Sequence, residues 1–323
     1  MIRKIGIAGA GSFGTAVAMV VDRAVAAECA IALWDVDVER IARLRHTRRN
    51  DLLSGVTLSG RISPTADFAD LADAEIIFIV TPSFAIREMT VRLADAKAGG
   101  ILVSCTKGIE HGTRLRMSQI LAHDLPGNTV AVLSGPSHAE EMAAGVPTAV
   151  ALGCENEEAL RKVETVLGQP RFHIAPSADC AGIELGGALK NSYAIAAGVV
   201  DGLGYGYNTK AAFITYAMQE LARLGEAMGG RRETLYGLSG LGDLTATCFS
   251  SHSRNRLVGE RLACGESLAE ISASMTMVAE GVSVTLNCFE YASERRISVP
   301  LMEAVYGALY EGLPPGGIVE RFL

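Results

Sequence analysis

One lysine lies inside one of the most apolar stretches of the chain. Lys190 belongs to the segment ELGGALKN (184–191), and the pattern of small and apolar residues continues to Val200. Burial of an ammonium group lowers its pKa toward the range that suits proton transfer. A lysine at a helix edge that extends its charge into water is the alternative. Because the residues on both sides are apolar or small, we interpret Lys190 as a functional acid/base.

Two further segments carry charged residues in places where ligands bind. Lys107 follows a predicted strand in the sequence SCTKG, and ligands of open α/β sheets bind beyond the carboxyl ends of the strands. A solvated loop lysine explains the same position equally well. Asp243 ends the glycine-rich segment GLSGLGD (237–243), where its carboxylate could accept hydrogen bonds or pair with an ammonium group.

Two predicted helix starts have residues that suit an anion. Ser253, Arg254 and Asn255 combine backbone amides, a guanidinium and a carboxamide, which together could bind a phosphate. An ordinary capped helix start is the alternative there. In the segment SGPSHAEE, Ser137 is predicted to cap a helix in a capping box with Glu140. That arrangement is compatible with amides and a hydroxyl that face a ligand.

The sharpest local motif is GAGSFG, from Gly9 to Gly14. It follows an apolar strand and opens a helix of small residues, the context that a dinucleotide-binding loop requires. Gly9 permits the tight turn, Gly11 lets the backbone approach a pyrophosphate, and Gly14 allows close packing of helix on sheet. The helix N-terminus adds free N–H groups and a positive dipole end. A glycine-rich turn without a ligand is the alternative.

Asp35 ends the second predicted strand, about 20 residues beyond Gly14, where a dinucleotide-binding fold places its ribose-binding acid. Such a carboxylate accepts hydrogen bonds from the ribose hydroxyls and repels a 2′-phosphate, which favours NAD(H). Arg40 and Arg43 are close in sequence and could instead pair with that phosphate, so NADP(H) stays open. Asp35 could equally be the N-cap of the next helix.

The elements that position these residues alternate through the first half of the chain. Short apolar, β-branched runs separated by helical patterns indicate a parallel sheet covered on both faces. The predicted strands are Lys4–Ala8, Ala30–Trp34, Glu75–Val80, Ile101–Cys105, Thr129–Ser134 and Pro147–Leu152, and the predicted helices include Thr15–Ala26, Asp37–Leu44, Ala85–Ala94 and Thr113–Ala122.

After about Asp179 the strand-like runs end. Gly187–Val199 and Lys210–Met228 have helical patterns, and glycine-rich turns such as GLGYGYN and GLSGLGD separate the helical segments. The fold class is therefore α/β, with a Rossmann-type sheet domain followed by an all-helical domain. We expect a dinucleotide-binding domain over residues 1–178 and a substrate-binding domain over residues 179–323.

Composition excludes several other classes of protein. The 323 residues are 49% hydrophobic, enough for two cores, and a net charge of -7 argues against nucleic-acid binding. The seven cysteines include no CxxC and the six histidines no HExxH, which indicates reduced thiols and no bound metal. Neither a targeting segment nor an apolar run of about 18 residues occurs, so we expect a cytoplasmic protein without a membrane span.

Taken together, these segments resemble bacterial-type NAD(P)-dependent glycerol-3-phosphate dehydrogenases. The matching motifs follow the family's order from Ile5 to about Pro300: GAGSFGTA, CTKGIE, SGPSHAEE, ELGGALKNSYAIAAG, SGLGDLTATC, SRNR and VAEGV. The resemblance implies a helical domain like the C-terminal domain of 6-phosphogluconate dehydrogenase. It also implies a homodimeric enzyme that interconverts dihydroxyacetone phosphate and sn-glycerol 3-phosphate with NAD(P)H, for phospholipid synthesis.

The resemblance also implies roles for individual residues. Lys190 would be the catalytic acid/base, and Lys107 a lysine near both substrate and cofactor. The other substrate-binding residues would be Gly135, Ser137, Asp243, Thr247, Ser253, Arg254 and Asn255. The cofactor-binding residues would be Gly9, Gly11, Ser12, Phe13, Gly14, Asp35, Lys107, Ala139, Arg254, Val278 and Glu280.

Two departures from the family pattern stand out. Many members have Arg or His two residues on from the start of the second-strand Trp motif, where this chain has Trp34-Asp35-Val36. This difference weakens the family's usual NADPH preference and strengthens the Asp35 argument for NADH. Tyr216 stands where the family usually has Arg, a change that bears on substrate-side electrostatics or on pairing between the domains.

Two rival functions fit parts of the pattern. A β-hydroxyacid-type dehydrogenase would share both domains and a lysine acid/base but would bind a carboxylate, whereas the SGLGD…SRN spacing favours a triose phosphate. A non-catalytic dinucleotide sensor would keep the glycine loop and could lose the chemical residues. Here both lysines, Asp243, Arg254 and Asn255 are present, which favours an enzyme.

Overall fold

The computed structural model describes residues 2–275 and 278–323, and the chain forms two compact units. The first unit runs to Thr106 and resumes over Met117–Cys180. The second contains Lys107–Arg116 together with Ala181–Leu323. The units therefore differ from a single division near residue 178, because a short segment from the first half of the sequence packs with the second unit.

The first unit is built on a sheet whose described strands follow the order β3-β2-β1-β4-β5-β6-β7-β8. These strands are β1 (Lys4–Ala8), β2 (Ala30–Trp34), β3 (Ile62–Thr65), β4 (Ile76–Ile79), β5 (Ile101–Ser104), β6 (Val130–Ser134), β7 (Thr148–Gly153) and β8 (Phe172–Ser177). Neighbouring strands are parallel except β6 and β7 within the described residues. The strand order reverses between β1 and β4, and ligands of such sheets bind at this point.

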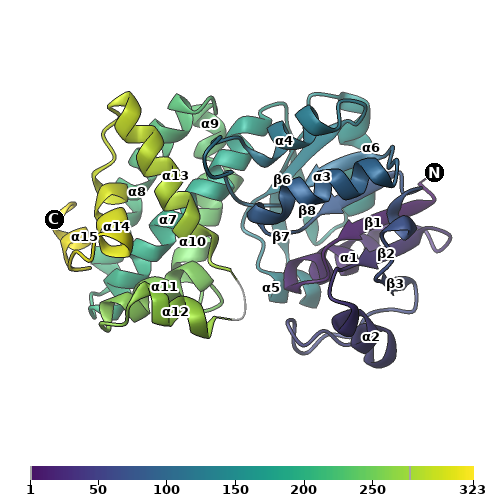
Figure 1. Cartoon of the computed structure of the whole chain (residues 1–323), viewed down its shortest axis with the longest axis horizontal. Coiled ribbons are helices and arrows are strands. Elements are labelled where there is room, and N and C mark those ends of the chain that lie inside the picture. Colours follow the sequence, from purple (N-terminus) through teal and green to yellow (C-terminus); the bar gives the residue numbers. More distant parts are fainter. Residues whose placement is uncertain (1, 276–277) are drawn as a thin grey trace. The chain divides into compact units, whose positions relative to one another are not determined.

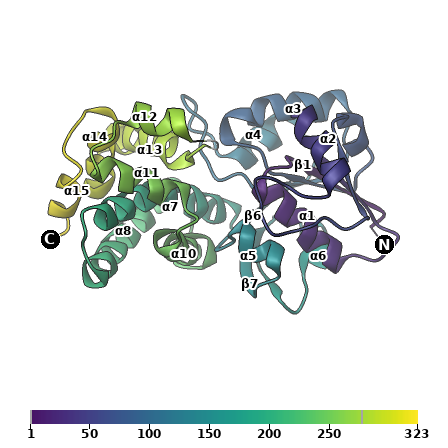
Figure 2. The ribbon, with the colours of Figure 1, turned by 90° about the horizontal axis from the view of Figure 1, so that it is seen from below.

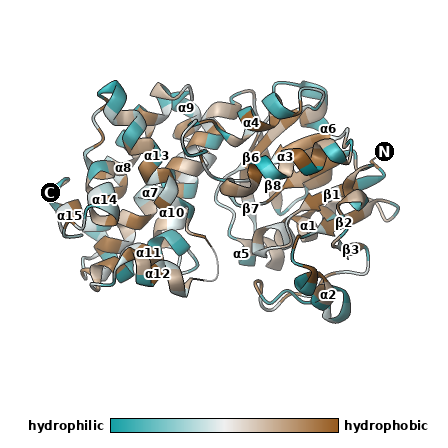
Figure 3. Ribbon diagram, in the orientation of Figure 1, coloured by the Kyte–Doolittle hydropathy of each residue, from teal (hydrophilic) through white to brown (hydrophobic). Residues whose placement is uncertain are grey.

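Helices cover both faces of this sheet. They are α1 (Ser12–Ala24), α2 (Val38–Thr47), α3 (Ile86–Asp95), α4 (Met117–Asp124), α5 (Ala139–Ala144) and α6 (Glu157–Leu167), with 3-10 turns at Phe68–Leu71 and Ser83–Ala85. Helices α1, α5 and α6 lie against one face, and α3 and α4 against the other (Figure 2). The strands are apolar along most of their length, as Figure 3 shows, because both of their faces are buried.

The predicted strands all occur, but β3 and β8 were not predicted. Both are edge strands, and each contains a proline, Pro64 and Pro176 respectively. Proline cannot donate to a strand ladder and is confined mainly to edges, so it weakens the strand pattern where an edge strand tolerates it. The predicted helix Thr113–Ala122 was also misplaced, because α4 begins only at Met117.

The second unit is helical in its described part (Figure 1). Its helices are α7 (Cys180–Gly202), α8 (Tyr207–Ala227), α9 (Arg232–Leu235), α10 (Asp243–Phe249), α11 (Arg254–Ala263), α12 (Leu268–Ser274), α13 (Glu280–Arg295), α14 (Pro300–Tyr310) and α15 (Gly317–Glu320). Helix α7 is buried continuously from Gly182 to Val200 and forms the centre of the unit. Among the described residues, no helix has the length and apolar character needed to cross a membrane.

One glycine-rich segment of the second unit differs from its prediction. GLSGLGD was expected to form a turn, but Leu238–Gly242 is a single π-helical turn that leads directly into α10. Such turns are rare and occur frequently at functional sites. The turn makes Asp243 the first residue of α10.

Candidate active site

The glycine motif forms the turn between β1 and α1, at the point where the strand order reverses. Gly9 has a φ of +119°, and a Cβ there would lie 2.6 Å from the carbonyl oxygen of Val80. At Gly14 a Cβ would lie 1.8 Å from the Gly9 carbonyl oxygen. At Gly11, by contrast, no described atom lies within 4 Å of the Cβ position. The turn, the close packing and the open backbone face agree with the three predicted roles.

The N-terminus of α1 opens beside this free face. Gly11 is the N-cap, and Ser12 and Phe13 are the first two residues of the helix. Their N–H groups precede the first intrahelical hydrogen bond, in which the Thr15 amide donates to the Gly11 carbonyl over 3.0 Å. Free amides and the helix dipole at an open glycine face fit the pyrophosphate of a dinucleotide.

Buried hydroxyls mark the same edge of the sheet. Thr81, Ser104 and Ser134, at the carboxyl ends of β4, β5 and β6, have buried oxygens without a hydrogen-bond partner among the described residues. Buried polar atoms in proteins are almost always paired. Their position at adjacent strand ends therefore fits a polar ligand at this edge.

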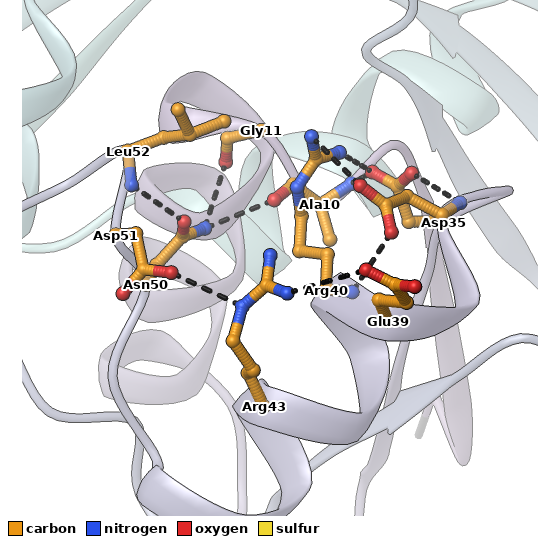
Figure 4. Close-up of polar contacts among 10 residues, drawn as sticks. Ala10, Gly11, Asp35, Glu39, Arg40, Arg43, Asn50, Asp51 and Leu52 are labelled. Atoms are coloured by element: carbon orange, nitrogen blue, oxygen red, sulfur yellow. Dashed lines mark hydrogen bonds and ion pairs between the residues drawn. The ribbon is translucent and has the colours of Figure 1, made fainter.

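Asp35 is fixed to the glycine loop (Figure 4). Its carboxylate accepts hydrogen bonds from the Ala10 amide over 2.7 Å, from the Asp37 amide over 3.0 Å, and from Arg40 Nη1 over 3.0 Å. The interpretation of Asp35 as the N-cap of α2 is wrong, because Asp37 occupies that position and accepts from the Arg40 amide. Asp35 is free of the capping role and stays next to the loop.

The two arginines near Asp35 are already paired with acids (Figure 4). Arg40 contacts Asp37 over 3.3 Å in addition to Asp35. Arg43 contacts Asp51 over 3.1 Å and Glu39 over 3.9 Å. Each guanidinium therefore faces two carboxylates, which reduces the positive charge that it offers to a 2′-phosphate.

The segment after β6 differs in detail from its prediction. Helix α5 begins at Ala139 with His138 as its N-cap. The Ser137 hydroxyl instead donates to the Gly135 carbonyl over 2.9 Å, so the predicted capping box is wrong. Gly135 has a φ of +150°, and a Cβ there would lie 3.0 Å from the backbone of Val150.

The second unit brings together four of the predicted site residues. Lys107 Nζ lies 2.6 Å from Asp243 Oδ2, and Lys190 Nζ lies 3.1 Å from Asp243 Oδ1. Lys190 also donates to Thr247 Oγ1 over 2.6 Å, and the Thr247 hydroxyl donates to Asp243 Oδ1 over 3.2 Å. Lys190 is only 6% exposed, which excludes its interpretation as an edge lysine that extends into water.

Burial and charge both act on this cluster. Desolvation lowers the pKa of Lys190 to about 8, and the positive charge of Lys107 acts in the same direction, while Asp243 opposes the shift. Burial by itself raises the pKa of Asp243, but the two ammonium groups outweigh it and hold that pKa below its ordinary value. The two lysines thus share one buried carboxylate.

Close backbone contacts place Asp243 next to α7. A Cβ on Gly186 would lie 2.8 Å from the Gly240 amide nitrogen, and a Cβ on Gly240 would lie 1.8 Å from the Leu235 carbonyl oxygen. Only glycine permits these approaches, so the π-helical turn packs directly against α7. Asp243 follows the turn, and Thr247 lies one helical turn later on the same face.

Lys107 is held by the segment that follows it. The Asn287 carboxamide, 1% exposed on α13, donates to the Ile109 carbonyl over 2.9 Å and contacts His111 Nδ1 over 2.8 Å. Arg116 then pairs with buried Glu184 of α7 over 2.7 Å. These contacts explain why Lys107–Arg116 packs with the second unit.

The predicted phosphate-binding segment begins α11. Ser253 is the N-cap and accepts a hydrogen bond from the Arg256 amide over 3.2 Å, which confirms the predicted cap. Arg254 Nη1 donates to the Val278 carbonyl over 2.9 Å, so these two predicted cofactor residues are adjacent. Glu280 begins α13, two residues after Val278.

Asn255 makes contacts that the sequence did not reveal. Its Nδ2 donates to Asn191 Oδ1 over 2.9 Å, and its Oδ1 accepts from the Gly281 amide over 2.9 Å. The side chain thereby joins α11 to α7 and α13. Asn191 was absent from the predictions, although a buried amide directly after Lys190 was a signal that could have identified it.

Tyr216 lies on α8 and is 47% exposed, with its ring 6.3 Å from that of Phe322. No group of three or more His, Cys, Asp or Glu residues in the described part of the chain is arranged to hold a metal ion.

Comparison with known proteins finds family models that match both halves of the chain. Models of NAD-dependent glycerol-3-phosphate dehydrogenase match the chain at residues 4–160 for the N-terminus and at residues 179–320 for the C-terminus. The chain belongs to the NAD-dependent glycerol-3-phosphate dehydrogenase family. The resemblance inferred from the motifs is confirmed.

Relatives of this family match the chain over its length. Two proteins named glycerol-3-phosphate dehydrogenase (NAD(P)+) come from Desulfitobacterium hafniense (strain Y51) and Moorella thermoacetica. The first is 39% identical over 99% of this chain and 91% of its own, and the second is 42% identical over 100% and 96%. A solved glycerol-3-phosphate dehydrogenase structure from Coxiella burnetii has a TM-score of 0.93 at 35% identity and covers 99% of this chain and 98% of its own.

The buried Arg116–Glu184 pair gives a stability prediction. Arg116→Met leaves the Glu184 carboxylate buried without this partner, and we expect it to lower the free energy of unfolding by about 3–5 kcal/mol in urea denaturation. Arg116→Met combined with Glu184→Leu should recover most of the loss. Arg161→Met, which breaks an exposed pair with Glu157, is the control and should change little. A loss for Arg116→Met no greater than this control would contradict the prediction.

Proposed function

We propose that this protein is an NAD(P)-dependent glycerol-3-phosphate dehydrogenase, which interconverts dihydroxyacetone phosphate and sn-glycerol 3-phosphate. The observation that carries this proposal is the buried cluster in which Lys190 and Lys107 share the carboxylate of Asp243. A buried lysine with a pKa near 8 can act as a general acid/base at neutral pH. The family supplies the reaction and the cluster supplies the proton-transfer group.

The two units have different roles in this proposal. The first binds the dinucleotide, within the predicted domain 1–178, and the second binds the substrate, within the predicted domain 179–323. The open backbone face at Gly11 supports the first role, and the paired lysines support the second. When bound, the nicotinamide of the cofactor supplies the hydride chemistry.

The lysine cluster handles the proton. During reduction, Lys190 Nζ donates a proton to the carbonyl oxygen of dihydroxyacetone phosphate as that oxygen becomes an alkoxide. Lys107 adds positive charge, which stabilises the developing negative charge. Asp243 keeps both ammonium groups in place, and the Thr247 hydroxyl accepts a further hydrogen bond from Lys190. In the reverse reaction, neutral Lys190 removes the hydroxyl proton.

The start of α11 suits the phosphate of the substrate. The Arg254 guanidinium and the amides of the first turn are the groups that we expect to bind it. The Asn255 side chain is already paired with Asn191 and Gly281, so its expected contribution is its backbone N–H. Motif position further assigns Gly135 and Ser137 to the substrate and Ala139, Val278 and Glu280 to the cofactor.

We also propose that NAD(H) is preferred over NADP(H). Asp35 places a carboxylate at the end of β2, and the nearby Arg40 and Arg43 are each engaged by two carboxylates. By family resemblance, we propose a homodimer that supplies glycerol 3-phosphate for phospholipid synthesis. The odd number and wide spacing of the seven cysteines support a cytoplasmic, reducing location.

A spectrophotometric assay tests the reaction. Absorbance at 340 nm should fall when NADH and dihydroxyacetone phosphate are added. Lys190→Met should lower kcat by roughly 100-fold or more while NADH still binds, because it removes the general acid. Lys162→Met, on the exposed face of α6, is the control and should keep normal kcat. Turnover only with carboxylate substrates would favour a β-hydroxyacid dehydrogenase, and NADH binding without any turnover would favour a sensor.

Substitution of Asp35 tests the cofactor preference. Asp35→Ser removes the carboxylate and leaves Arg40 paired with Asp37 alone, so the ratio of kcat/KM for NADPH to that for NADH should rise by about tenfold or more, as for a change of about 1.4 kcal/mol. Glu157→Gln, at an exposed position of α6, is the control and should leave the ratio almost unchanged. A wild-type enzyme that is faster with NADPH would contradict the preference and leave the reaction in place.

The pKa of Lys190 near 8 predicts opposite pH profiles for the two directions. The kcat for reduction should fall as pH rises through about 8, because Lys190 loses its proton, and kcat for oxidation should rise over the same range. Asp243→Asn should move both limbs to lower pH, since Asp243 raises this pKa. Lys107→Met should move them to higher pH, since Lys107 lowers it. Three superimposable profiles would show that another group controls the rate.

A further inference from the structure

A buried asparagine outside the glycine motif is hydrogen-bonded to the loop that the motif forms (Figure 4). Asn50 follows α2 and is 4% exposed. Its Nδ2 donates to the Ala10 carbonyl over 2.9 Å and to Thr15 Oγ1 over 2.6 Å, with the Gly11 carbonyl at 3.4 Å. Its Oδ1 accepts from the Leu52 amide over 3.0 Å. Both sides of the carboxamide are therefore used.

The chain around Asn50 is itself fixed in place. Arg48, the C-cap of α2, adopts the left-handed conformation with φ +59° and turns the chain back toward the sheet. Its guanidinium donates to the Ile62 carbonyl over 2.8 Å and to the Ser59 carbonyl. Leu53, 1% exposed, belongs to the core of the first unit. Asn50 thus approaches the glycine loop from a rigid support.

Fixing these carbonyls also fixes the amides of the loop. The Ala10 carbonyl shares a peptide plane with the Gly11 N–H, and the Gly11 carbonyl shares one with the Ser12 N–H. In a trans peptide the C=O and N–H bonds point in opposite directions, so carbonyls directed at Asn50 leave the two N–H groups directed away from it. Asp35 holds the other side of Ala10 through its amide.

This restraint matters most at a glycine. Gly11 has no Cβ, and no described atom lies within 4 Å of the position where one would be, so local sterics do little to fix its peptide planes. Amides that are already oriented bind an anion without an ordering cost at the moment of binding. The Asn50 contacts supply the orientation that glycine itself cannot provide.

We propose that Asn50 is a positioning residue for the pyrophosphate of the dinucleotide: it holds the carbonyls of Ala10 and Gly11 so that the N–H groups of Gly11 and Ser12 face the ligand. This inference rests on the proposed dinucleotide binding. It predicts that Asn50 affects only ligands that contain the pyrophosphate, and that it acts on cofactor affinity and leaves the chemical step unchanged.

The test compares ADP-ribose, which contains the pyrophosphate, with adenosine, which lacks it. Asn50→Asp keeps the shape and the acceptor for the Leu52 amide, but its second oxygen cannot donate to the Ala10 carbonyl, whereas the Thr15 hydroxyl can turn to donate to it. Affinity for ADP-ribose, measured by displacement of NADH fluorescence, should fall by tenfold or more, and adenosine affinity should stay within twofold. The KM for NADH should rise, while kcat at saturating NADH and the KM for dihydroxyacetone phosphate stay near wild type.

Neighbouring substitutions provide the controls. Asp51→Asn changes the adjacent, exposed residue, which pairs with Arg43, and should bind ADP-ribose normally. Thr15→Ser keeps the hydroxyl that accepts from Asn50 and should also be normal. Thr15→Val removes that hydroxyl and should weaken ADP-ribose binding without affecting adenosine. If circular dichroism shows that Asn50→Asp does not fold, the ADP-ribose affinities of Thr15→Ser and Thr15→Val are compared instead, and a loss in Thr15→Val alone supports the positioning role.

The outcomes separate this inference from the proposed function. Failure of the wild-type protein to bind ADP-ribose would overturn the proposed dinucleotide site itself. If the wild-type protein binds ADP-ribose and folded Asn50→Asp binds it with the same affinity, only the positioning role is overturned. If only Thr15→Val folds, unchanged ADP-ribose affinity in that variant has the same meaning. Equal losses for ADP-ribose and adenosine would also overturn it, because they would indicate general loosening of the first unit.

Discussion

The buried carboxylate of Asp243 allows two lysine ammonium groups to lie close together inside the helical unit. Two ammonium groups at 2.6 and 3.1 Å would repel each other and resist burial without it. With it, Lys190 stays buried and keeps a pKa near 8, where both protonation states are accessible. Removal of any member changes the charge felt by the other two. The surrounding structure therefore has to hold the side chains of Lys107, Lys190 and Asp243 at fixed distances from one another.

The helical unit fixes the positions of these side chains by close packing of its backbone segments. Gly198 and Gly259 lie where α7 and α11 cross, and a Cβ on either would come within 1.9 Å of a carbonyl oxygen of the other helix. Gly186 allows the same close approach between α7 and the π-helical turn, and Gly240 allows it between that turn and α9. Because the backbones approach so closely, short side chains such as those of Asp243 and Thr247 can reach Lys190.

The first unit uses side chains to fix a flexible backbone. The glycines that open the loop to a ligand also deprive it of steric restraint. Asp35 holds the Ala10 amide and Asn50 holds the Ala10 carbonyl, so the loop is fixed from both sides by residues distant in sequence. In the first unit glycine leaves the loop open to a ligand, and in the second it lets helices approach closely. In both units buried polar side chains then hold the functional groups in position.

The sequence by itself determined the features that depend on local pattern: the apolar strands, the helical second half, the glycine turn and the burial of Lys190. It failed where a distant partner decides the outcome. The Ser137 hydroxyl bonds to Gly135 and does not form the expected capping box, and the proline-containing edge strands were missed. Only the tertiary structure brought Asn50 to the loop and Lys107 to Asp243. Hydrophobic periodicity repeats within a few residues, whereas a buried hydrogen bond needs a partner whose position the whole fold determines.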